Sequence, residues 1–93
     1  MELLALADRI SDVRRKVTAV VDSVIFDQYQ ANAFAFIAKR LDEMEFECRS
    51  AKLRPATERH AEIGRITEET DPSVLPPEVG GELIAVEKAY LRI

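Results

Sequence analysis

Neither proline nor glycine occurs between Met1 and Arg54, a stretch that covers more than half of the 93 residues of this chain. These two residues are the strongest breakers of regular secondary structure, so their absence favours long uninterrupted elements. Tryptophan is absent and aromatic residues make up only 6% of the chain, so aliphatic side chains and alanine must fill most of the core. A core of that kind suits helices.

Apolar residues recur within this stretch at alternating intervals of three and four, in two successive sets. The first set is Leu3, Leu6, Ile10, Val13, Val17, Val20 and Val24, and the second is Phe34, Ile37, Leu41, Met44, Cys48 and Ala51. Each set has the spacing of a helix that packs along its length on another helix.

The polar run DQYQAN, residues 27–32, separates the two sets. Asp27 is a typical helix N-cap and Gln30 completes a capping box, so we expect an antiparallel helical hairpin with its corner here. Two alternatives stay open. A single helix over residues 1–54 would be about 80 Å long and would need a partner chain to cover its seam. The β-branched run KVTAVVDSVIF and the alternating ANAFAF favour a β-hairpin instead, although the corner lacks a glycine for a tight turn.

The rest of the chain predicts two shorter helices separated by a turn. Pro55 suits the first position of a helix, which we expect over about residues 55–69. The run DPSVLPPEVGG, with three prolines and two glycines, predicts a turn or linker over residues 70–78. A second short helix is expected over about residues 79–92, because apolar residues recur there at intervals of four and three: Val79, Leu83, Val86, Tyr90 and Ile93.

With hairpin helices over about residues 2–26 and 28–53, the chain is therefore expected to form a single all-α domain over residues 1–93. The predicted architecture is a small helical bundle, a long antiparallel hairpin with two shorter helices, that is completed by dimerisation.

Charge and hydropathy argue against several classes of partner. The formal net charge is −4 and no part of the chain is strongly basic, so we expect no nucleic-acid partner. No stretch approaches the roughly eighteen apolar residues of a membrane span, and the segment MELLALADR lacks the pattern of a signal peptide. We therefore expect a cytoplasmic protein with no membrane partner.

Residues that could carry chemistry are few. One histidine, His60, and one cysteine, Cys48, are too few for a metal site of the usual nitrogen and sulfur type. Cys48 lies on the apolar seam, where we interpret it as a small buried residue. The acids between residues 42 and 47 do not converge on one helix face. The sequence thus predicts no catalytic, cofactor-binding or metal-binding residue, and no cofactor.

The stretch ERHAEIGR places His60 four residues before Gly64. This spacing resembles the motif of histidine phosphotransfer domains, helical bundles with an exposed histidine that accepts a phosphoryl group. The lysine of that motif is missing here, and the acidic Glu62 stands in the interval. Because His60 shares a predicted helix face with Ala56 and Ile63, we interpret it as a half-buried packing residue.

Three segments resemble the AroQ class of chorismate mutases: ELLALADRISDV, AKLRPATERHAEIGRI and LPPEVGGELIAVEKAYLRI. The resemblance implies an intertwined helical dimer without a cofactor, in which cationic side chains clamp two substrate carboxylates. The first-helix arginine of that clamp falls at Ala7 and the mid-helix arginine near Val24 and Ile25, so only Arg59 matches. A helical enzyme of this type, like phosphotransfer, remains the alternative to the expectation that the chain is not an enzyme.

The region between residues 20 and 38 carries more apolar side chains than one neighbouring helix can cover. Large exposed apolar patches mark interaction surfaces, most simply between two copies of a chain. We therefore expect a small acidic protein–protein interaction module, such as an adaptor, inhibitor, chaperone or assembly component, that forms a homodimer or binds another protein. The expected surface comprises Val20, Val24, Ile25, Phe26, Tyr29, Phe34, Phe36, Ile37, Leu83, Val86 and Tyr90.

Overall fold

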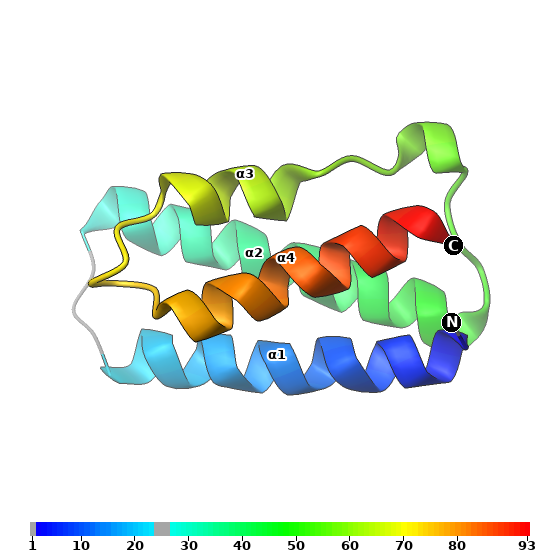
Figure 1. Cartoon of the computed structure of the whole chain (residues 1–93), viewed down its shortest axis with the longest axis horizontal. Helices are drawn as coiled ribbons and strands as arrows, with labels where there is room; N and C mark the ends of the chain where they lie inside the picture. The colour runs from blue at the N-terminus through cyan, green and yellow to red at the C-terminus, as the bar shows by residue number, and fades with distance from the viewer. Residues whose placement is uncertain (1, 24–26) are drawn as a thin grey trace.

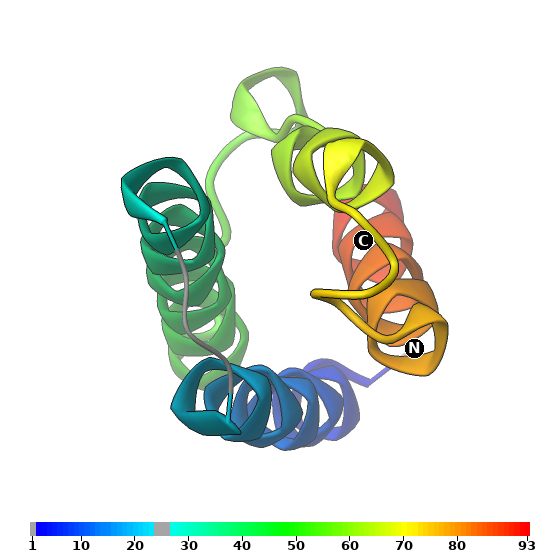
Figure 2. The ribbon, with the colours of Figure 1, turned by 90° about the vertical axis from the view of Figure 1, so that its left-hand side faces the viewer.

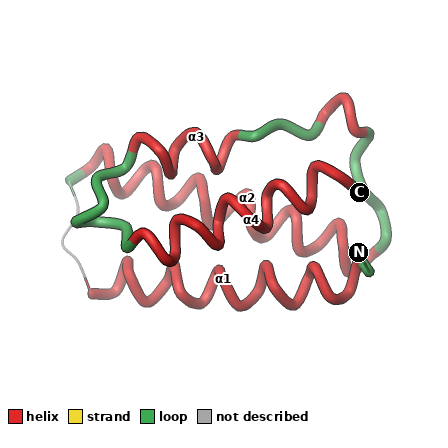
Figure 3. Tube along the Cα trace, viewed as in Figure 1, coloured by secondary structure: helices red, strands yellow, loops and turns green. Residues whose placement is uncertain are grey.

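The computed structural model describes residues 2–23 and 27–93, which form a bundle of helices (Figure 1). The helices are α1 (Leu3–Ser23), α2 (Gln28–Ser50), α3 (Glu62–Glu69) and α4 (Pro77–Arg92), with a short 3₁₀ turn, η1, at Ala56–Glu58. The predicted all-α class, a long antiparallel hairpin with two shorter helices, is confirmed. Dimerisation stays a prediction. No strand occurs in the described ranges (Figure 3), so the β-hairpin alternative is wrong there.

Asp27 forms the corner of the hairpin. The backbone N–H of Gln30 donates to Asp27 Oδ1 at 2.8 Å, and the backbone N–H of Asp27 donates to Gln30 Oε1 at 3.2 Å. This reciprocal capping box starts α2 at the predicted position, and a single helix over residues 1–54 is wrong. Residues 24–26 lie outside the described residues.

The end of α2 comes earlier than the sequence predicts. The helix was expected to run to about residue 53 but ends at Ser50, because Ala51 adopts the left-handed conformation with φ of 55°. The backbone N–H of Lys52 then donates to Glu47 O at 3.0 Å, which satisfies a carbonyl of the last helical turn. This reversal directs the chain towards η1.

The helix predicted over residues 55–69 is divided in the structure. Only residues 56–58 form the turn η1, Arg59 is extended, and α3 begins at Glu62. The start of α3 is set by α4: the backbone N–H groups of Ile63 and Gly64 donate to the Glu87 carboxylate, each at 2.8 Å. A carboxylate at a helix N-terminus satisfies its free N–H groups and complements its dipole. The cap of α3 is therefore a tertiary contact.

One hydrophobic core runs between the helices. Both predicted seams contribute to it, Leu6, Ile10, Val13 and Val17 from α1 and Phe34, Ile37, Leu41, Met44 and Cys48 from α2. The other buried apolar residues are Ala7, Ile63, Leu75, Leu83, Val86 and Tyr90. The heptad spacing thus identified the packed faces of both long helices.

The four helices are arranged in a ring when viewed along the bundle (Figure 2), in which α1 packs against α2 and α4, and α3 packs mainly against α4. Gly80 permits the close approach of α3 to α4, since a Cβ there would lie 3.1 Å from Thr67 Cγ2. The packing between α2 and α3 is much less extensive, and this side of the ring carries the cleft described below. None of the helices in the described part is long and apolar enough to cross a membrane.

Candidate functional site

Five of the residues expected at an interaction surface belong to the core instead. Phe34 and Ile37 point inwards from α2, and Leu83, Val86 and Tyr90 form the inner face of α4, each at most 4% exposed. The sequence pattern correctly marked an apolar stripe on α4. The prediction that this stripe is a docking surface is wrong, because α1 and α3 of the same chain pack against α4 and its stripe is buried.

The remaining predicted surface residues have different environments. Tyr29 is 77% exposed, whereas Val20 and Phe36 are half-buried. Val24, Ile25 and Phe26 lie outside the described residues. Among the described residues of the predicted surface, Tyr29 is the one that is clearly available to a partner.

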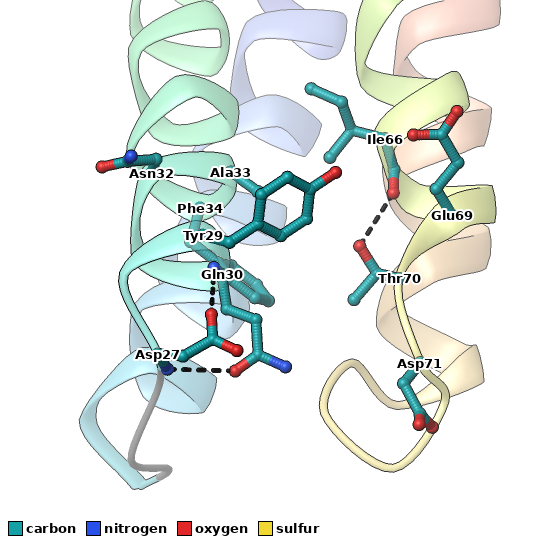
Figure 4. Close-up of a pocket in the computed structure, with 10 residues that line it drawn as sticks. All are labelled: Asp27, Tyr29, Gln30, Asn32, Ala33, Phe34, Ile66, Glu69, Thr70 and Asp71. Atoms are coloured by element: carbon teal, nitrogen blue, oxygen red, sulfur yellow. Dashed lines mark hydrogen bonds between the residues drawn. The ribbon is translucent and has the colours of Figure 1, made fainter.

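A cleft with a volume of about 500 Å³ lies beside Tyr29, between the N-terminal part of α2 and the C-terminal part of α3. Tyr29 extends from α2 towards the α3 wall, and Asp27 and Asp71 stand on opposite sides (Figure 4). Volumes of this size are typical of binding pockets. The cleft is lined by Asp27, Tyr29, Gln30, Asn32, Ala33, Phe34, Ile66, Glu69, Thr70 and Asp71.

Local hydrogen bonds position both walls of the cleft. The capping box of Asp27 fixes the first turn of α2, which carries Tyr29. On the α3 side, Thr70 Oγ1 donates to the backbone oxygen of Ile66 at 2.8 Å, and the backbone N–H of Ser73 donates to Asp71 Oδ1 at 2.9 Å. The bond from Ser73 holds the pKa of the Asp71 carboxyl below its usual range. Asp71 is thus an anion at neutral pH.

The residues around the cleft are strongly biased in charge. Its lining includes three acids and no lysine, arginine or histidine. More broadly, residues 17–38 and 66–75 together hold five of the 17 acids of the chain and none of its 13 bases. We call the described residues of these two stretches the acidic end of the bundle, where α1 and α3 end and α2 begins (Figure 1). The other residues, with twelve acids and thirteen bases, are nearly neutral.

A second depression lies on the other side of α2, in the groove between α1 and α2. It has a volume of about 260 Å³ and is lined by Val17, Thr18, Val21, Ala31, Phe34, Ala35 and Ala38. Six of these seven side chains are apolar, and Val21 is 38% exposed. The N-terminal part of α2 thus forms one wall of an acidic cleft and one wall of an apolar groove.

A cluster of charged and polar side chains occupies the other half of α2. Tyr90 Oη donates to Glu47 Oε1 at 2.7 Å, and the backbone N–H of Arg54 donates to the same oxygen at 2.9 Å. The Arg54 guanidinium donates to Glu47 Oε2 at 3.0 Å and to Glu43 Oε2 at 2.9 Å. Arg40 donates to Glu43 at 3.1 Å. The cluster joins α2, α4 and the connection after α2.

The protonation states of this cluster are fixed by its own contacts. Burial opposes the charge of Glu47, but the hydrogen bonds from Arg54 and Tyr90 outweigh it and lower the pKa of Glu47. Burial and the bond to Glu47 raise the pKa of Tyr90 to about 12. At neutral pH Glu47 is therefore ionised and Tyr90 protonated, each engaged by the other. This arrangement holds α2, α4 and the connection after α2 together.

The residues considered for catalysis are placed apart from the cleft. His60 is exposed and lies between η1 and α3, so its predicted packing role is wrong. It also precedes the start of α3, so His60 and Gly64 are not one turn apart on a shared helix. The Arg59 guanidinium stacks 5.7 Å from the ring centroid of Tyr90 and donates to the Tyr90 backbone oxygen at 3.0 Å.

Cys48 is buried as predicted, and burial, together with the nearby Glu47 carboxylate, raises the pKa of its thiol. Among the described residues, no group of three histidine, cysteine, aspartate or glutamate side chains is placed to hold a metal ion.

Comparison of the chain with known protein families, with curated proteins and with solved structures found no match. The chemistry of its own surface is therefore the basis for a functional proposal. Around Tyr29 that surface combines an exposed aromatic ring, a cleft and a concentration of acids.

Proposed function

We propose that this protein is an interaction module that binds another protein through the acidic end of the bundle. The observation that carries this proposal is Tyr29, which is 77% exposed on the wall of a cleft of about 500 Å³. Tyrosine is enriched in the energetic centres of protein interfaces, because it combines a large apolar area with a polar tip and few rotatable bonds. A partner that covered Tyr29 would remove an exposed aromatic ring from water.

The surroundings of Tyr29 suit a protein partner. The apolar groove on the opposite side of α2 extends the surface around the helix, and the alanines at positions 31, 35 and 38 leave room for a partner to approach the backbone. Phe34 lines both depressions and fixes their shared wall in the core. An interface over both would have an apolar centre and a polar rim, as protein interfaces do.

Charge favours a different protein over a second copy at this surface. A two-fold contact brings the same patch of both copies together, and here it would place the three acids of the cleft, Asp27, Glu69 and Asp71, opposite the same three acids of the second copy. Like charges that face each other across an interface oppose association. A homodimer through another surface stays a prediction, which the solution mass at several concentrations tests.

Site-specific photo-cross-linking tests the proposal. A photoreactive phenylalanine analogue in place of Tyr29 is compared with the same analogue in place of Thr57, an exposed residue of η1 at the opposite end of the bundle (Figure 1). In the source cells we expect discrete cross-linked species from position 29 and none of these from position 57. Equal products from both positions, or none from position 29, would contradict the proposal.

A further inference from the structure

We infer that the cleft between α2 and α3 accepts an arginine- or lysine-bearing segment of the protein partner. This inference rests on the proposed function and specifies the chemistry of the partner. The cationic head would lie between the acids of the cleft, Asp27, Glu69 and Asp71, and the aliphatic stem would lie against the apolar residues that line it.

The first argument is the shape and composition of the cleft. Phe34, Ala33 and Ile66 provide apolar contact, while the acids stand around them. Arginine and lysine have the matching distribution, an apolar stem that ends in a charged head. The ring of Tyr29, which extends into the cleft (Figure 4), adds a π-face on which a cation is favourable.

The second argument is charge complementarity. The acidic end has five acids and no base in its two stretches, so its field attracts cations and repels nucleic acids and anionic lipid surfaces. A basic segment is the protein partner that this field steers towards the cleft.

The third argument is the position of the acids on α3. Glu68 and Glu69 occupy the last turn of this helix, which contains no base, and Asp71 lies two residues beyond its end. The C-terminus of a helix carries partial negative charge, so acids there destabilise the free protein and cations stabilise it. A cation bound in the cleft would relieve this repulsion, which links the unfavourable placement of the acids to the binding of a base.

The test uses two fluorescent peptides and the full chain. One is a short acetylated, amidated helix of alanine and leucine with arginines one turn apart; the other has citrulline, a neutral near-isostere, in place of each arginine. Binding is measured by fluorescence anisotropy at low and moderate salt. We expect the arginine peptide to bind about tenfold more tightly than the citrulline peptide, and this difference to shrink as salt screens the charges.

Variants locate the effect on the protein. The double variant Glu69→Gln with Asp71→Asn keeps the side-chain shapes and the acceptor for Ser73, and we expect it to remove most of the preference for arginine. Tyr29→Ala should weaken both peptides. The double variant Glu2→Gln with Glu58→Gln, two exposed acids at the opposite end of the bundle, also removes two charges; it is the charge-matched control and should change neither affinity.

Three results would overturn the inference. Equal binding of both peptides to the wild type would show an apolar contact without charge recognition. Equal losses in the control with Glu2→Gln and Glu58→Gln and in the variant with Glu69→Gln and Asp71→Asn would show a response to net charge alone. Spermidine competing as well as the arginine peptide would show a site for small polyamines. None of these changes the cross-linking result at position 29, so failure of this inference is distinguishable from failure of the proposed function.

Discussion

The attachment of α3 to α4 depends on Glu87, and its substitution makes a quantitative prediction. Glu87 is 3% exposed and accepts the backbone N–H groups of Ile63 and Gly64, each at 2.8 Å. These are the first free N–H groups of a helix that has no side-chain cap of its own. Glu87→Gln keeps the size of the side chain but removes its charge.

The expected loss follows from the contacts that change. Hydrogen bonds to charged groups contribute about 1.5–3 kcal/mol each, and the charge–dipole interaction at a helix end contributes about 0.3–1 kcal/mol. Because the amide oxygen still accepts a bond, we expect Glu87→Gln to lower the free energy of unfolding by about 1–3 kcal/mol. Glu87→Ala, which removes both bonds, should cost about 3–5 kcal/mol, a large part of the stability of a domain of this size.

Urea denaturation followed by circular dichroism measures these losses, and hydrogen exchange localises them. In Glu87→Gln the amides of α3 should exchange faster than those of α1 and α2, because α3 is held mainly by α4. Lys88→Gln, an exposed neighbour on α4, is the control and should stay within about 0.5 kcal/mol of the wild type. A loss below about 0.5 kcal/mol, or unchanged exchange in α3, would refute the role given to Glu87.

Three further predictions concern the core and the polar cluster. Tyr90→Phe removes the donor to Glu47 and should lower stability by about 1–2 kcal/mol in the same denaturation assay; an unchanged midpoint would contradict the bond. The pKa of Glu47 is lowered in the folded state, so its contribution to the free energy of unfolding is present above the unfolded pKa of about 4.3 and is lost as pH falls below that value. The pKa of Tyr90 is raised to about 12 in the folded state, so stability falls as pH rises above the unfolded pKa of about 10. Denaturation across pH should show both slopes, and Glu47→Gln should flatten the acidic one. Leu83→Ala should destabilise the chain by about 2–5 kcal/mol, since Leu83 is fully buried; retained stability with altered association would restore it as an interface residue.

The long helices could be predicted from the sequence because their determinants are local. The intervals of three and four between apolar residues mark one face of a helix whatever it packs against, and the box formed by Asp27 and Gln30 needs only four consecutive residues. Both features appear in the structure where the sequence places them.

The start of α3 could not be predicted in the same way. Its cap comes from Glu87, 23 residues beyond Gly64, and no local pattern announces this contact. Residues 55–61 have acceptable helical sequence, yet η1 and the extended Arg59 replace the helix there. The tertiary contact determines the boundary and also leaves His60 exposed.

The candidate site was only partly predictable. An apolar stripe shows that a helix face is covered, but it does not show by what, so Leu83, Val86 and Tyr90 were assigned to a partner when α1 and α3 cover them. Tyr29 was found as a surface residue. The acidic cleft was missed because its acids come from segments far apart in the chain, although the absence of bases from residues 17–38 and 66–75 was a visible signal.

The most direct test of whether the acidic end binds a basic partner is a titration of the labelled protein with the arginine peptide. The backbone amide chemical shifts are recorded at each addition. We predict that the largest changes fall within residues 27–34 and 66–71, the segments that provide the lining of the cleft, and that they diminish in the Glu69→Gln, Asp71→Asn variant. Changes centred on the polar cluster around Glu47 and Arg54, or spread evenly over all helices, would contradict the account.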